Sequence, residues 1–139
     1  MFYMIKMFAL LLLINGQSKD GILKAVVIEI IEANHYIVTD DSGKEYSVIL
    51  SDTKLSANET KKNEALKYVK EKIYKKTVYV FIDKQTNSQI YGSLIYECDE
   101  VNDNVNDIPC QSANSLDLEL IKLGYVTYTG ANKFLKQLN

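Results

Sequence analysis

Residues 35–50 read HYIVTDDSGKEYSVIL and carry the clearest structural signal in the chain. Two runs rich in β-branched residues and tyrosine flank the sequence DDSG at 40–43, whose glycine supplies the positive φ of a tight turn. In the second run, Tyr46, Val48 and Leu50 fall on one side and Glu45 and Ser47 on the other, as in a strand with one buried face. The segment therefore predicts a β-hairpin with one strand on each side of the turn, at residues 35–39 and 44–50.

Further strands are predicted on both sides of this hairpin. Residues 22–31 are dense in β-branched residues with two apolar faces, which predicts a long central strand. Residues 77–82 alternate in the same way, and a polar turn at 83–89 separates them from a fifth strand at 90–96.

Two helices are predicted from changes in this pattern. Residues 56–59, Ser-Ala-Asn-Glu, have the form of a capping box, and apolar residues at helical spacing follow up to Ile73, so we expect the helix to end near Lys75 and Lys76. A second, short helix is expected after Asn114 as its cap. It carries an apolar stripe and is stopped by Gly124, and the stripe consists of Leu116, Leu120 and Leu123.

The order of these elements is three strands, a helix, two strands and a helix. The chain is therefore expected to be mainly β with helices, in the α+β class. This order predicts a five-stranded OB-fold Greek-key barrel, with a helix between strands 3 and 4 and a C-terminal helix. A parallel βαβ fold would require more alternation of strands and helices than the sequence contains.

Composition sets limits on function. The chain has 139 residues, enough for one domain, and a formal net charge of -2. All 16 basic residues are lysine, because the sequence contains no arginine. This excludes every mechanism that requires the rigid, bidentate guanidinium group on a phosphate or carboxylate.

The first residues predict export. Residues 1–18 contain one charge, Lys6, and a short apolar run at 7–14, followed by small residues, which is typical of a signal peptide. The run is far shorter than the roughly 20 residues that span a bilayer. We expect residues 19–139 to form a secreted or periplasmic monomeric domain without stable membrane association. The alternative is an uncleaved, membrane-anchoring helix.

Export would place Cys98 and Cys110 in an oxidising compartment. A disulfide between them would close a loop of about a dozen residues, worth roughly 3 kcal/mol in the chain-entropy model. The alternative is two free thiols. The acidic residues at 97–107 between them lack EF-hand spacing, so we expect a solvated loop rather than a calcium site.

Six segments together carry a family resemblance, which covers residues 24–128. The segments are residues 23–38, 46–53, 63–66, 77–83, 91–96 and 116–126. With its segments in this order, the sequence resembles the staphylococcal-nuclease-like (thermonuclease) family, which implies an OB-fold and, for active members, calcium-dependent cleavage of DNA or RNA.

Active members of that family hold calcium with oxygen ligands from two aspartates and a threonine. The resemblance places Asp52 and Thr53 at the Asp-Thr pair and Asn34 at the second aspartate position. Calcium is therefore a possible cofactor, with these three residues as its candidate ligands.

The remaining catalytic positions of the family are altered in this chain. A glutamate acts on the attacking water, and two arginines hold the scissile phosphate and stabilise its charge. The arginine positions fall on Ser47 and Tyr91, and the glutamate position falls on Leu55. Loss of one such charge donor costs roughly 100–1,000-fold in rate, so the resemblance implies a catalytically degenerate member.

Three functions follow as alternatives. The first is a degenerate domain that acts as a binding or interaction module for an unknown partner. The second is a weak calcium-dependent nuclease with a site rebuilt around Asp52. The third is a small secreted structural protein. Lys61, Lys62 and Lys70 on the predicted helix are candidate phosphate contacts for weak nucleic-acid binding.

Overall fold

The computed structural model describes residues 21–100 and 110–131, so the predicted signal peptide at 1–18 lies outside the described residues. The described chain is mainly β with two helices, which confirms the α+β class. Its elements are β2 (Ile22–Glu32), β3 (His35–Thr39), β4 (Glu45–Leu50), β5 (Thr53–Leu55), α1 (Glu59–Ile73), β6 (Thr77–Thr86), β7 (Gln89–Glu100), β8 (Cys110–Ser115), α2 (Leu116–Lys122) and β9 (Val126–Tyr128).

The main sheet has six strands in the order β4-β3-β2-β6-β7-β8, and β4 also pairs with β7. The β4–β7 pairing is parallel, whereas the other pairs in this sheet are antiparallel. Hydrogen bonding therefore runs from β4 through β3, β2, β6 and β7 back to β4, and β8 extends the sheet beyond β7. Strands β5 and β9 form a separate antiparallel pair.

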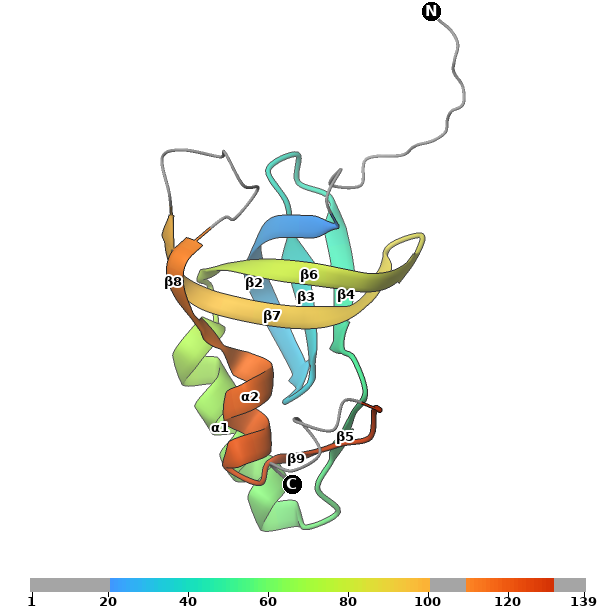
Figure 1. Ribbon diagram of the computed structural model, residues 1–139, viewed down its shortest axis with the longest axis vertical. Coiled ribbons are helices and arrows are strands. Elements are labelled where there is room, and N and C mark those ends of the chain that lie inside the picture. The colour runs from blue at the N-terminus through green and yellow to red at the C-terminus, as the bar shows by residue number, and fades with distance from the viewer. Residues whose placement is uncertain (1–20, 101–109, 132–139) are drawn as a thin grey trace, which may run out of the picture.

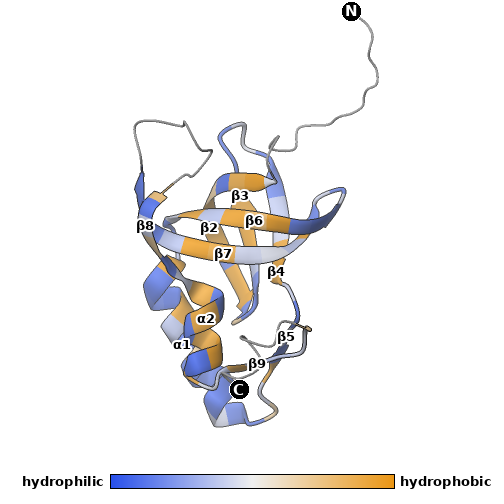
Figure 2. Cartoon of the chain, in the orientation of Figure 1, coloured by the Kyte–Doolittle hydropathy of each residue, from blue (hydrophilic) through white to orange (hydrophobic). Residues whose placement is uncertain are grey.

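The core lies between the inner faces of these strands and the two helices, which lie side by side below the sheet in Figure 1. Apolar residues line the strands of the main sheet in Figure 2. The predicted alternation in the hairpin is confirmed, because Tyr46, Val48 and Leu50 are all buried. The apolar face of α1 is also buried, through Ala65, Val69 and Ile73.

The helix ends differ from the sequence prediction. Asn58 caps α1, because its side chain accepts a hydrogen bond from the Lys61 N–H, whereas Ser56 Oγ accepts only from the Asn58 N–H. The helix ends at Ile73, and Lys75 then adopts a positive φ of 62° and donates its N–H to the Val27 carbonyl. Contact with β2 therefore ends the helix before the two lysines.

The second helix also differs at both ends. Ser115 caps α2 by accepting from the Leu118 N–H, whereas the Asn114 amide donates to Glu97 instead. Leu123 is 46% exposed, and Ile121 takes the buried position that was expected for it.

Two predicted turns or loops are partly strands. β6 and β7 continue through the polar residues that were predicted as a turn at 83–89, so the turn is confined to Asn87 and Ser88. β7 also extends to Glu100, and β8 begins at Cys110. The start of the predicted acidic loop, at residues 97–100, is thus strand, and its residues 101–107 lie outside the described part.

The predicted disulfide is confirmed. Cys98 on β7 and Cys110 on β8 are bonded, with their Cα atoms 5.3 Å apart. The bond joins the two strands at the end where their pairing register is irregular. None of the helices in the described residues is long and apolar enough to span a membrane.

A carboxylate links α1, α2 and β7. Glu119 on α2 accepts hydrogen bonds from Tyr68 on α1 (2.8 Å) and from Tyr96 on β7 (2.5 Å). Burial, followed by the hydrogen bond to Glu119, raises the pKa of both tyrosines. Glu119 therefore satisfies two phenol groups at the junction of three elements.

A glycine allows β6 and β7 to approach closely. A Cβ atom at Gly92 would lie 2.1 Å from the Phe81 carbonyl oxygen, well inside contact distance. Gly92 pairs with Ile82, next to the irregularity in the β6–β7 register at Ile82/Lys84. No side chain fits here unless one of the two strands moves.

Replacement of Glu119 should weaken the contacts between α1, α2 and β7. We expect Glu119→Ala to lower the free energy of unfolding by about 2 kcal/mol, because the buried Tyr96 hydroxyl loses its acceptor. Glu119→Gln, which keeps an acceptor oxygen, should cost less. Urea denaturation measures both, and equal losses in the two variants would contradict this role.

Gly92→Ala should destabilise the fold by about 2–3 kcal/mol, because the added methyl group overlaps backbone atoms. Gly43→Ala serves as the control, because Gly43 has a positive φ of 86° but no atom within 4 Å of the added Cβ. It should cost only about 1 kcal/mol. Thermal or urea unfolding compares the two, and a larger loss at Gly43 would disprove the steric argument.

Candidate functional site

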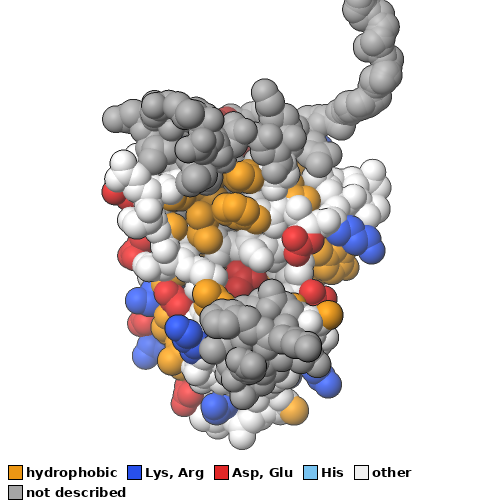
Figure 3. Space-filling model, in the orientation of Figure 1, with side chains coloured by type: hydrophobic (Ala, Val, Ile, Leu, Met, Phe, Trp, Pro, Cys, Tyr) orange, Lys and Arg blue, Asp and Glu red, His pale blue; other side chains and the backbone are white. Residues whose placement is uncertain are grey.

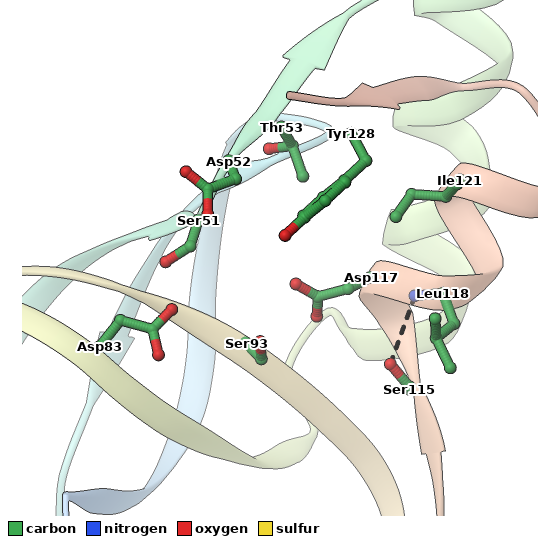
Figure 4. A pocket seen from close by; sticks show the side chains of 10 residues that line it. All are labelled: Ser51, Asp52, Thr53, Asp83, Ser93, Ser115, Asp117, Leu118, Ile121 and Tyr128. Carbon is green, nitrogen blue, oxygen red and sulfur yellow. Dashed lines mark hydrogen bonds between the residues drawn. The ribbon is translucent and has the colours of Figure 1, made fainter. Parts of the chain in front are cut away.

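A cavity of about 310 Å³ lies where the β4–β5 connection meets β6, β7, β9 and α2 (Figure 4). Three carboxylates line it: Asp52 after β4, Asp83 on β6 and Asp117 on α2. Figure 4 shows Asp83 and Asp117 pointing toward each other across the space. A neighbouring cavity of about 360 Å³ shares Asp52 and Asp83 and is also lined by Lys84 and Tyr91.

Backbone hydrogen bonds fix Asp52 at the cavity. The preceding residue, Ser51, donates its N–H to the Gly92 carbonyl at 2.9 Å, and the Asp52 carbonyl accepts from the Thr129 N–H at 2.7 Å. Asp52 has a φ of 55°, which is uncommon for a residue with a side chain. The connection after β4 is thus held between β7 and the segment after β9.

Asp117 is the most perturbed acid of the cavity. It is the second residue of α2, and its Oδ1 atom accepts a hydrogen bond from the Leu94 N–H at 2.9 Å. Burial raises the pKa of Asp117 to about 6, and the negative charge of Asp83 adds to this rise. The hydrogen bond from Leu94 opposes it, since it favours the ionised form.

The three candidate calcium ligands are neighbours in the fold. Asp52 and Thr53 both line the cavity. Asn34 is buried, and its amide donates to Thr53 Oγ1 at 3.1 Å, while that hydroxyl donates to the Leu50 carbonyl at 2.8 Å. Asn34 therefore reaches the site through Thr53 and is not part of the cavity wall.

The positions of the family's arginines and glutamate are separated in this structure. Ser47 Oγ is hydrogen-bonded to His35 Nε2 at 2.7 Å. Tyr91 lines the neighbouring cavity, with Lys84 Nζ 5.8 Å from its ring centroid. Leu55 lines a third cavity of about 260 Å³, together with Glu59. Of the three, only Tyr91 shares a cavity with Asp52, and neither Ser47 nor Leu55 lines either cavity at Asp52.

The candidate phosphate-contacting lysines lie on α1, apart from the carboxylates. Lys61 and Lys70 are exposed, and Lys62 Nζ lies 3.7 Å from the Glu59 carboxylate. None of the three lines the cavity that Asp52, Asp83 and Asp117 share. They form a separate basic face.

Sequence reasoning did not assign Asp83, Asp117 or Tyr128 to the site, although all three line the cavity. Asp83 lies in the segment predicted as a polar turn, Asp117 follows the predicted cap Asn114, and Tyr128 lies beyond the predicted end of the second helix at Gly124. The only available signal was that Asp83 and Asp117 stand at the ends of predicted elements, where side chains from different elements meet. Their convergence depends on pairings between distant segments.

The carboxylates do not form a ready metal centre. Within residues 21–100 and 110–131, no three His, Cys, Asp or Glu side chains are grouped so that they could hold a metal ion. The cavity instead combines separated negative charges with the apolar side chains of Leu118 and Ile121.

Comparison with models of protein families gives no match, and comparison with curated protein sequences gives none either. The family resemblance seen in the sequence therefore stays a prediction.

The raised pKa of Asp117 gives a pH prediction. Because the folded state raises it from the ordinary 3.8 to about 6, the folded protein binds this proton more tightly than the unfolded chain does. The stability contributed by this proton is present below about pH 4 and is lost as the pH rises through about 6. NMR of the side-chain carboxyl groups should show a titration midpoint near pH 6 for Asp117. The midpoint should be lower in Asp83→Asn, because that variant removes the negative charge that helps to raise the pKa.

Urea unfolding across the same pH range provides the second measurement. The stability of Asp117→Asn relative to wild type should increase between about pH 4 and pH 6, because asparagine does not titrate. A constant difference across this range would show that Asp117 titrates normally.

Proposed function

We propose that the chain is an exported, thermonuclease-like OB-fold domain that has lost catalysis and acts as a binding module. The cyclic pairing of β4, β3, β2, β6 and β7 supports a five-stranded OB barrel. The Cys98–Cys110 disulfide supports an oxidising compartment and hence export.

The charge of the cavity carries the argument against catalysis. A phosphodiester in its transition state gains negative charge and needs positive groups directed at it. Among the described residues, the wall of the cavity beside Asp52 instead presents Asp83 and Asp117 and no lysine. Because the full sequence contains no arginine, no other segment can bring a guanidinium group to this cavity. Such a cavity disfavours a phosphate and favours a ligand of positive charge.

One observation favours a weak calcium-dependent nuclease as the second candidate. Asp52 and Thr53, which match the calcium-binding pair of the family, lie on the same cavity as the two other carboxylates. If calcium were bound there, it would supply positive charge for a phosphate. The donors fit in kind, since calcium prefers carboxylate and other oxygen ligands.

A nuclease assay separates the two functions. The chain, produced for export and purified in its processed form, should not degrade plasmid or oligonucleotide DNA in calcium above the level seen with chelator. Asp52→Ala should leave this background unchanged. Calcium-dependent cutting that Asp52→Ala abolishes would establish the nuclease and disprove the binding module.

A further inference from the structure

The wall of the Asp52–Asp83–Asp117 cavity is divided into a charged side and an apolar side. The carboxylates come from the β4–β5 connection, β6 and the second residue of α2, whereas Leu118 and Ile121 follow Asp117 on α2. The ring of Tyr128 lies between the two sides, close to Asp52 and Ile121 in Figure 4. A ligand that fills this space meets negative charge at one end and hydrocarbon at the other.

The negative charges of the cavity are not neutralised by the described part of the chain. The ion pairs formed there are Lys24–Glu100 and Lys62–Glu59, and neither involves the cavity. Lys84 lines the neighbouring cavity, where its Nζ lies over the Tyr91 ring. The fold thus keeps Asp83 opposite Asp117 although the two carboxylates repel each other.

A buried hydroxyl at the same wall also lacks a partner. The Oγ atom of Ser51 has less than 1 Å² exposed and makes no hydrogen bond within the described residues. Ser51 lines both this cavity and its neighbour. An unpaired buried hydroxyl is unfavourable, so a bound donor that reached the Ser51 hydroxyl would satisfy it.

The arrangement of the groups decides between two kinds of cation. The carboxylates are not grouped as a metal ion requires. An ammonium group needs no such convergence, because its three N–H donors point in different directions. An alkyl chain attached to it would cover Leu118 and Ile121, and the face of a tyrosine ring such as Tyr128 attracts a cation.

We propose that this cavity binds a primary alkylammonium group, with the ammonium between Asp52, Asp83 and Asp117 and the alkyl chain against Leu118, Ile121 and Tyr128. The proposal rests on the proposed binding function and names the chemistry of its ligand. Two sources carry this chemistry: a free alkylamine and the lysine side chain of a protein. The cavity, at about 310 Å³, suits a small group of this kind.

NMR titration of the processed, disulfide-bonded chain tests the proposal. The probes are n-butylammonium and Nα-acetyl-lysine N-methylamide, added at constant ionic strength above the pH range in which Asp117 titrates. Both should give saturable shifts of the Leu118 and Ile121 methyl signals. Tighter binding of n-butylammonium would indicate a free amine, and tighter binding of the lysine derivative would indicate a protein side chain.

Two variants test the carboxylates of the cavity, and a third variant and one neutral probe serve as controls. Asp83→Asn and Asp117→Asn should each weaken binding about tenfold, as expected when a charged hydrogen-bond acceptor becomes neutral. Asp117→Asn keeps the oxygen that accepts from Leu94, and Asp83 is exposed, so both variants should fold. Asp41→Asn, an exposed turn residue outside the cavity, should bind as wild type does. Butanol, with the same chain and no charge, should not bind.

The proposal is wrong if butanol gives the same shifts, if the three variants bind equally, or if neither amine gives saturable shifts. It is also wrong if calcium binds the cavity and displaces both amines at lower concentration. The nuclease assay is independent of these results. If the chain shows no nuclease activity and binds no amine, the alkylammonium proposal is wrong and the proposed binding function still stands.

Discussion

The parallel hydrogen bonding between β4 and β7 is the constraint on which the site depends. It pairs Ser47–Leu50 with Gln89–Gly92, and at its end Ser51 donates to the Gly92 carbonyl. Asp52 follows directly and is therefore delivered to the edge of β6 and β7, where Asp83 lies. Gly92 makes this possible, because only a residue without Cβ fits so close to the Phe81 carbonyl. One missing side chain thus brings two distant aspartates to a common cavity.

The third carboxylate is placed by different means. β8 pairs with β7 and leads without a break into α2, so Asp117 begins the helix beside Leu94 of β7. The disulfide holds the far end of β8 on β7, and Glu119 holds α2 against Tyr68 and Tyr96. Asp117 is therefore held half-buried near another carboxylate by contacts on both sides of it. The fold offsets this electrostatic cost through hydrogen bonds and packing elsewhere.

Local features of the fold could be predicted from the sequence, and distant pairings could not. The hairpin of β3 and β4 follows from alternation and a Gly43 turn, all within sixteen residues. The helix caps were wrong by one or two residues because Ser56 and Ser115 each have a neighbouring asparagine of similar capping strength. Strand β9 was missed because three residues show no period, and it forms only against β5.

The sequence predicted only part of the candidate site. Asp52 and Thr53 were identified because the family resemblance places them at its Asp-Thr pair, directly after a recognisable strand. Nothing in the order of residues shows that Asp117 accepts from Leu94, since an acid in the first turn of a helix is ordinary. The cavity is thus the product of tertiary contacts that leave no local pattern.

The distribution of charge separates two surfaces of the molecule. Figure 3 shows acidic side chains at the middle of one face, between the sheet and the helices. The lysines of α1, by contrast, lie on its exposed side and do not line the cavity of Asp52, Asp83 and Asp117. A phosphate is attracted by the helix and repelled by the cavity, whereas a small cation experiences the reverse. Any nucleic acid that binds this chain should therefore contact α1 in a salt-dependent way, at a distance from the carboxylates that catalysis would have to use.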